Sequence, residues 1–103
     1  MDITAAEFNS RYQDDNSFSI IDVREELEFQ TFNLGGTNIP LKKLLMDVDA
    51  LDYAKDNEIV VVCQRGLRSG TATQALLQQG YTHVRNLRGG ILAVRKLNQN
   101  LSN

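Results

Sequence analysis

The stretch from residue 59 to residue 69 decides the fold, and it reads Ile59-Val60-Val61-Val62-Cys63-Gln64-Arg65-Gly66-Leu67-Arg68-Ser69. Its first four residues are β-branched without a polar interruption, which is typical of a strand buried on both faces of a parallel sheet. A polar loop containing a glycine follows, and Ser69 is a natural N-cap for a helix running to about Gln79. Strand, tight loop and helix in this order favour an α/β fold.

Further strands and helices alternate on both sides of this stretch. We expect strands at residues 18–23 and 83–87, and helices at 4–12, 24–29, 41–45 and 91–97. Turns are expected at 14–17 and 56–58, and Gly80 should end its helix in the left-handed conformation with Tyr81 packing back. The tail after residue 97 is polar and expected to fray. This order predicts a single domain over residues 1–103 with a mostly parallel sheet covered by helices on both faces.

The composition limits the classes of function that the chain can have. The chain has 103 residues, 42% hydrophobic and 23% charged, as in a globular domain. A single cysteine excludes an internal disulfide and a C-x-x-C redox pair, and a single histidine argues against a His-based metal site or a Ser-His-Asp triad, so we expect no metal site. No apolar run approaches the ~20 residues that span a bilayer, and the N-terminus lacks a signal pattern, so we expect a cytoplasmic protein without a membrane partner.

Charge is divided unevenly along the chain. All 13 acids lie at or before Glu58 with five bases, which gives a net −8, whereas the six bases after it have no acid beside them and give +6. The two halves either interleave in space and neutralise each other, or the second half lines a site for an anion. The bases are scattered and aromatic residues make up only 7%, so a nucleic-acid partner is not expected.

Cys63 is the candidate nucleophile. Ligands of open α/β sheets bind beyond the carboxyl ends of the strands, and Cys63 follows such an end. Unpaired N–H groups at the start of the next helix, together with Arg65 and Arg68, favour the thiolate and lower the thiol pKa below about 8.5. Gly66 supplies the positive φ that a tight loop requires. The alternative is that Cys63 is a small buried apolar residue ending a strand.

The run C-Q-R-G-L-R-S, between I-V-V-V and a helix ending in Q-Q-G-Y, resembles the active-site loop of rhodanese-like sulfurtransferases. Three further segments are similar to the family's motifs. They are Ile21 to Glu25 with Glu28-Phe29, Gly36 with Asn38 to Leu41, and Val84, Asn86-Leu87, Gly89 to Ile91 and Ala93. Two positions depart from the family pattern, since residues 32–37 lack its Gly-His and Val94 replaces its tryptophan.

The resemblance implies a three-layer domain with about five strands, and sulfur transfer through a persulfide on Cys63. A small sulfur-containing anion such as thiosulfate would be the donor, and cyanide, a thiol or a sulfur-carrier protein the acceptor. No cofactor is implied beyond the persulfide itself. The residues expected to bind substrate through loop backbone and charge are Gln64, Arg65, Gly66, Leu67, Arg68 and Ser69.

Other residues are assigned supporting roles. Asp22 ends an apolar strand and is expected to be tied to backbone N–H groups or to an arginine. Arg24 and Glu28, one helical turn apart, are expected to pair with each other. Ser69 is expected to cap a helix rather than catalyse, and Arg65 either contacts substrate or faces solvent. His83 begins a strand far from the Cys63 segment in sequence, which argues against a role for His83 as a general base.

Three alternative functions remain at this stage. The chain resembles the sulfur-relay domain of adenylyltransferases that activate sulfur carriers for molybdopterin or thiamine synthesis. A phosphatase or arsenate reductase also uses a Cys and an Arg around an anion, but with five residues between them, whereas four separate Cys63 from Arg68. The third alternative is a non-catalytic interaction module, although family members of that kind lack the cysteine that this chain retains.

Overall fold

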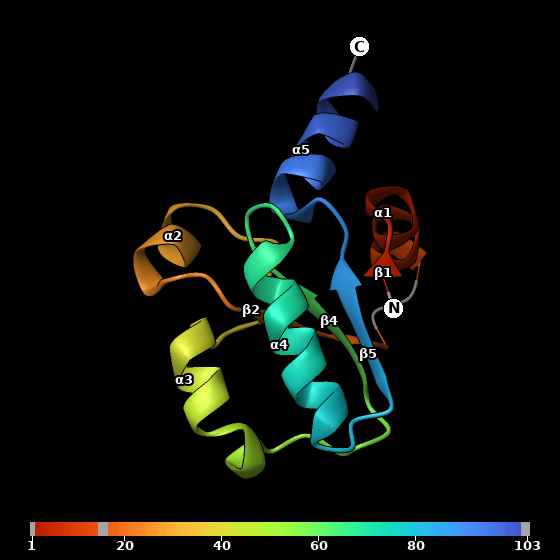
Figure 1. Cartoon of the computed structure of the whole chain (residues 1–103). Coiled ribbons are helices and arrows are strands. Elements are labelled where there is room, and N and C mark those ends of the chain that lie inside the picture. The colour runs from red at the N-terminus through yellow and green to blue at the C-terminus, as the bar shows by residue number, and fades with distance from the viewer. Residues whose placement is uncertain (1, 15–16, 102–103) are drawn as a thin grey trace.

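The computed structural model describes residues 2–14 and 17–101. Its described strands form one parallel sheet in the order β1-β5-β4-β2-β3 (Figure 1). The strands are β1 (Asp2–Ile3), β2 (Ser19–Asp22), β3 (Thr37–Asn38), β4 (Glu58–Val62) and β5 (His83–Leu87). The helices are α1 (Ala5–Asp14), α2 (Glu26–Thr31), α3 (Leu41–Met46), the short 3₁₀ helix η1 (Val48–Ala50), α4 (Leu67–Gln78) and α5 (Gly90–Leu101). The predicted α/β fold is confirmed.

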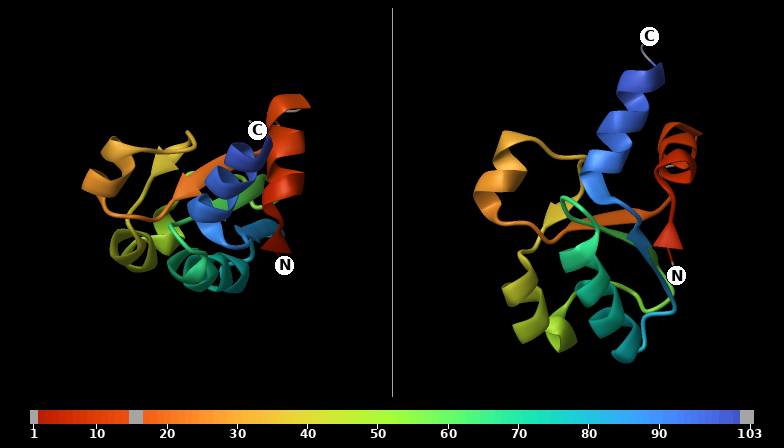
Figure 2. Two further views of the ribbon diagram at one scale, coloured as in Figure 1. Left: turned by 90° about the horizontal axis from the view of Figure 1, so that it is seen from above. Right: turned by 45° about the horizontal axis from the view of Figure 1, so that its top comes forward.

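Strand β4 lies at the centre of the sheet and is buried on both faces. Ile59 and Val61 pack into one core, and Val60 and Val62 pack into the other, as the two-residue period of a strand requires. Helices α3 and α4 cover the first core, and α1 and α5 cover the second (Figure 2). The unbroken β-branched run is therefore explained, because both of its faces need apolar side chains.

The carboxyl ends of β2, β4 and β5 meet at one edge of the sheet. Asp22 lies opposite Val62 in register, and the Val23 N–H donates to the Val62 carbonyl at 3.0 Å. On the other side of β4, Val61 lies opposite Asn86. Residues that follow the ends of these strands, Cys63 among them, are thus brought together by the topology.

The predicted elements differ from the structure mainly at their ends. Helix α1 begins at Ala5 and not at the predicted residue 4, because Thr4 caps it: the Glu7 N–H donates to Thr4 Oγ1 at 3.1 Å. Helix α2 begins at Glu26, after Glu25 has formed a capping box with Glu28, and not at the predicted residue 24. Gly80 has φ +96°, as predicted, and the buried Tyr81 packs on the α4 side. Residues 15–16 of the predicted turn lie outside the described residues.

Helix α5 is longer than predicted. It continues through residues 98–101, where a frayed tail was expected. Helix α5 packs along α1, and Asn9 Nδ2 donates to Asn98 Oδ1 at 2.6 Å. The contact with α1 therefore stabilises the last turns of α5. None of the described helices is long and apolar enough to cross a membrane.

Three of the six bases in the second half of the chain are paired with acids from the first half in the described structure. Arg68 pairs with Glu28, Arg85 with Glu7, and Arg88 with Asp2. Among the described residues, Arg65, Arg95 and Lys96 form no such pair. The interleaving of the two halves is therefore real but incomplete, and Arg65 lies within the loop that follows Cys63.

Candidate active site

Cys63 follows β4 directly, and its sulfur is the focus of several hydrogen-bond donors. Only 1% of the residue is exposed. The N–H groups of Gly66 and Ser69 donate to Sγ at 3.1 and 3.3 Å, and the Ser69 hydroxyl lies 3.2 Å away. Residues 63–69, which we call the Cys63 loop, therefore curl around the sulfur with their donors pointing inward. Such an arrangement binds a negative charge.

Gly66 turns the chain so that the N–H groups of the Cys63 loop can point at the sulfur. Its φ is +94°, in the left-handed region that glycine adopts without strain, and it is the N-cap of α4. The prediction that Ser69 caps this helix is wrong, because the turn at Gly66 starts the helix at Leu67. Ser69 therefore falls in the first turn, where a helical N–H has no partner within the helix and is free to point at the sulfur.

The environment of the sulfur favours the thiolate. Burial alone would raise the pKa of Cys63, but hydrogen bonds outweigh it and the pKa is lowered. The hydroxyl and N–H of Ser69 contribute most to the lowering, followed by the N–H groups of Gly66 and Arg65. The predicted direction is confirmed, but its leading cause is the donors of the loop rather than the guanidinium charges.

The two loop arginines have different surroundings. Arg68 donates from both terminal nitrogens to the Glu28 carboxylate, at 2.8 and 3.0 Å. That hydrogen bond is the main reason why the pKa of Arg68 is raised, and the charge of Cys63 adds to it, so the guanidinium does act on the sulfur. Arg65 is exposed. The side chain of Leu67 is also in solvent, whereas the Gln64 carbonyl accepts the Leu92 N–H at 3.1 Å.

The predicted pair between Arg24 and Glu28 is wrong. The buried Arg24 side chain instead donates to the fully buried Asp22 carboxylate, with Nη2 to Oδ2 at 2.9 Å, and to the Phe32 carbonyl. Asp22 also accepts the Arg24 N–H at 3.0 Å, so its expected tie to an arginine and to backbone is confirmed. Glu28 is thereby left to bind Arg68, and the two ion pairs connect β2, α2 and the Cys63 loop.

Asn86 of β5 was not predicted as a site residue. Its Oδ1 accepts the Ser69 hydroxyl at 2.5 Å, and its Nδ2 donates to the Gly66 carbonyl at 3.1 Å. The strand period places it on the same face as Val84, which belongs to the core under α4. A polar side chain on a core-facing position of a strand is the sequence signal that would have found it. His83, by contrast, is exposed at the start of the strand.

The N-terminus of α5 packs against the Cys63 loop. The Ile91 N–H donates to the Cys63 carbonyl at 2.9 Å. Gly90 approaches so closely that a Cβ there would lie 2.4 Å from the Gln64 carbonyl oxygen. The loop is therefore held from both sides, by α5 through the backbone and by Asn86 through a side chain.

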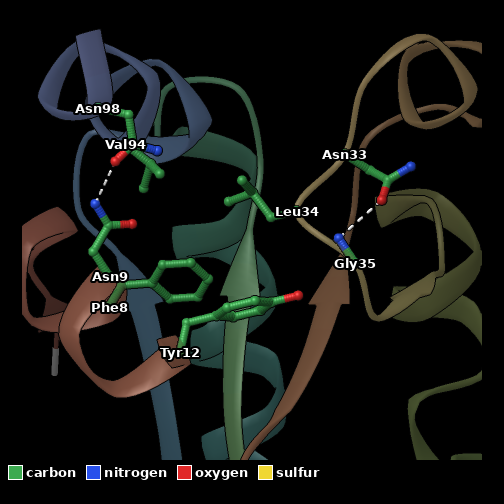
Figure 3. Close-up of a pocket in the computed structure, with 8 residues that line it drawn as sticks. All are labelled: Phe8, Asn9, Tyr12, Asn33, Leu34, Gly35, Val94 and Asn98. Atoms are coloured by element: carbon green, nitrogen blue, oxygen red, sulfur yellow. Dashed lines mark hydrogen bonds between the residues drawn. The ribbon is translucent and has the colours of Figure 1, made fainter. Parts of the chain in front are cut away.

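A separate hollow of about 490 Å³ lies away from Cys63, between α1, α5 and residues 33–35 (Figure 3). Phe8, Tyr12, Leu34 and Val94 form its apolar walls. The segment at 32–37 and Val94, where the sequence departs from the family pattern, thus meet at this hollow on the α1 side of the sheet. Among residues 2–14 and 17–101, no three His, Cys, Asp or Glu side chains gather as a metal site requires.

Comparisons with known proteins agree with this geometry. The thiosulfate sulfurtransferase PspE of Escherichia coli is 37% identical over 70 residues, covering 67% of this chain and 67% of that protein. The adenylyltransferase and sulfurtransferase UBA4 of Candida albicans is 31% identical over 96 residues, which cover 86% of this chain but only 22% of that protein. The human single-domain sulfurtransferase TSTD1 superposes with a TM-score of 0.80 at 25% identity, over 92% of this chain and 95% of that one.

The sequence profile of the Rhodanese-like domain matches residues 4–97, which include every strand and helix from α1 to β5 and most of α5. The match therefore contains Cys63, its loop and Asn86. By sequence and by fold, the chain belongs to the rhodanese-like domain family.

Proposed function

We propose that this protein is a sulfurtransferase that carries sulfane sulfur as a persulfide on Cys63. The observation that supports it most is the convergence of the Gly66 and Ser69 N–H groups on a buried sulfur whose pKa is lowered. Covalent catalysis of this kind needs one activated nucleophile, and the chain has one cysteine.

Thiosulfate is the donor that we propose. The Cys63 thiolate attacks the outer sulfur of thiosulfate, a new S–S bond forms, and the S–S bond of thiosulfate breaks as sulfite leaves with its electron pair. The terminal sulfur of the resulting persulfide is negative, and the N–H groups that surround Sγ are the donors proposed to stabilise that charge. Arg65 is exposed and unpaired among the described residues, which suits it to attract the incoming dianion.

An acceptor completes the cycle. Cyanide or a thiolate attacks the terminal sulfur of the persulfide, and the Cys63 thiolate is released as the leaving group. With a sulfur-carrier protein the terminal persulfide sulfur instead attacks the activated C-terminal carbonyl and the activating group leaves; a small thiol then cleaves the resulting acyl disulfide at the Cys63 sulfur, which releases the carrier thiocarboxylate, and a second thiol reduces the mixed disulfide left on Cys63. The cycle uses no cofactor and no second cysteine. A sulfur-carrier acceptor is the second candidate, and it is supported by the similarity to UBA4, which is named an adenylyltransferase and sulfurtransferase.

Phosphatase or arsenate reductase chemistry is less well supported. It needs a carboxylic acid that can protonate a leaving group. The Glu28 carboxylate approaches the loop, but its hydrogen bond with Arg68 lowers its pKa to about 2 and it is ionised at neutral pH. Asp22 is bound by Arg24 on the other side. Neither carboxylate is arranged to donate a proton at the sulfur.

Intact mass after incubation with thiosulfate tests the proposal. We expect a gain of one sulfur atom, about 32 Da, that is removed by cyanide and absent in Cys63→Ser. Cys63→Ser is the matched control because it retains the shape of the side chain. An unchanged mass with thiosulfate, and again with a persulfide donor of low molecular weight, would contradict the proposal and leave the non-catalytic interaction module as the better interpretation.

A further inference from the structure

The side-chain amide of Asn86 has a fixed orientation. Its Nδ2 donates to the Gly66 carbonyl at 3.1 Å, and its Oδ1 faces the Ser69 hydroxyl at 2.5 Å. The reversed amide would place two carbonyl oxygens against each other, since the Gly66 oxygen can only accept. The atom that faces Ser69 is therefore an acceptor, and Ser69 must supply the hydrogen.

This direction has a consequence at the sulfur. A hydroxyl carries one hydrogen, and when that hydrogen is donated to Asn86, Ser69 Oγ presents a lone pair to Cys63 Sγ at 3.2 Å. A lone pair suits a thiol, which can donate its S–H to Oγ. It does not suit a thiolate, which can only accept. For the thiolate to gain the Ser69 hydrogen bond, the hydroxyl must turn away from Asn86.

We propose that Asn86 is a positioning residue that controls the protonation of Cys63 through the direction of the Ser69 hydroxyl. It competes with the sulfur for a single hydrogen: while the hydroxyl points to Asn86 the thiol is favoured, and when the hydroxyl turns to Cys63 Sγ it joins the loop N–H groups that favour the thiolate or the persulfide. The proposal rests on the proposed function only in taking Cys63 as the reactive group.

Asn86 thus acts in two opposite ways. Through Nδ2 it holds the Gly66 carbonyl and keeps the loop N–H groups directed at the sulfur, which favours the thiolate. Through Oδ1 it withdraws the Ser69 hydroxyl, which favours the thiol. A substitution of Asn86 removes both effects, so a second substitution at Ser69 is needed to separate them.

The experiment follows thiolate absorbance against pH in four proteins: wild type, Asn86→Ala, Ser69→Ala and the double variant, each after subtraction of its Cys63→Ser counterpart. We expect Asn86→Ala to move the midpoint to lower pH when Ser69 is present, with about a two- to tenfold larger thiolate fraction below the midpoint, the size of one hydrogen bond. In the Ser69→Ala background this downward shift should vanish.

Thr73→Ala is the control, because the Thr73 hydroxyl bonds the Ser69 carbonyl at 2.7 Å and not its Oγ. It should leave the midpoint in place. The charged groups around the loop, which are Asp22, Arg24, Glu28, Arg65 and Arg68, are unchanged in all these proteins. Asn86→Leu, of similar volume, replaces Asn86→Ala if the latter does not fold.

An upward shift of equal size in both backgrounds would overturn the proposal, because Asn86 would then only brace the loop. An unmoved midpoint in both would overturn it too. Failure of the proposed function is recognised separately, as the absence of the persulfide in the mass measurement, while the titration of Cys63 does not depend on sulfur transfer.

Discussion

Glu28 of α2 binds both terminal nitrogens of the Arg68 guanidinium in α4, forty residues further along the chain. The pair joins the segment after β2 to the first turn of the helix that follows Cys63. A bidentate ion pair of this kind fixes the relative orientation of the two side chains in addition to pairing their charges. Its effect on stability is nevertheless small, because both side chains are 37% exposed and solvent screens them.

Glu28→Gln should therefore lower the free energy of unfolding by less than about 1 kcal/mol at neutral pH. The hydrogen bond from Arg68 lowers the pKa of Glu28 to about 2, against about 4.3 in an unfolded chain. The ion pair therefore makes its full contribution to the free energy of unfolding above about pH 4.3, and this contribution is lost as the pH falls toward 2. Urea unfolding of the variant and wild type across this range measures it.

Glu26→Gln is the control for this measurement, since it removes an acid from the same helix whose carboxylate meets only Gln30 in the described structure. The stability difference between Glu28→Gln and wild type should shrink on acidification, and that of Glu26→Gln should not follow it. If the two variants lose stability in parallel, Glu28 contributes only charge to α2 and not a bond to Arg68.

Gly90→Ala should be strongly destabilising, for two reasons that add. Its φ of +66° is strained for a residue with a side chain, and the new Cβ would lie 2.4 Å from the Gln64 oxygen and 2.6 Å from the Arg65 nitrogen. Gly80→Ala is the matched control, because φ is +96° there but nothing lies within 4 Å of the added carbon. It should cost only about 1 kcal/mol.

Urea unfolding compares the two glycine variants directly. We expect Gly90→Ala to lose at least about 2 kcal/mol more than Gly80→Ala, as close backbone contacts cannot relax. Equal losses would mean that α5 moves away from the Cys63 loop at little cost. The loop would then be held mainly by Asn86.

The sequence predicted strands β2, β4 and β5 and the position of Cys63 at the end of β4 because these depend on local pattern, whereas the two-residue strands β1 and β3 were not predicted. An unbroken β-branched run needs two covering layers, and a cysteine at its end must meet the N–H groups of the next helix. The ion pairs could not be predicted in the same way. Arg24 and Glu28 have the spacing of a helical pair, but helix α2 begins after Arg24, and each side chain finds a partner that only the tertiary fold brings near.

The roles of Ser69 and Asn86 were missed for a related reason. A serine before an apolar helical stretch has the ordinary pattern of a cap, and only the left-handed turn at Gly66 shows that the helix starts earlier. Asn86 is 23 residues after Cys63 in the sequence. Its contact with Ser69 follows from the pairing of β5 with β4, which no local pattern specifies.

Cys63 should make the stability of the protein depend on pH in a definite direction. Hydrogen bonds from the loop lower the pKa of the folded thiol despite its burial, whereas an unfolded chain has a pKa of about 8.5. A lowered pKa stabilises the fold above the unfolded value, and this stabilisation is lost as the pH falls through the folded pKa. The free energy of unfolding of wild type, minus that of Cys63→Ser, should therefore rise with pH up to about 8.5.

Urea unfolding under reducing conditions measures this difference, in which the other titrating groups cancel because they are common to both proteins. A difference that falls as the pH rises would mean that burial outweighs the donors of Gly66 and Ser69, and that the sulfur rests as an inert thiol.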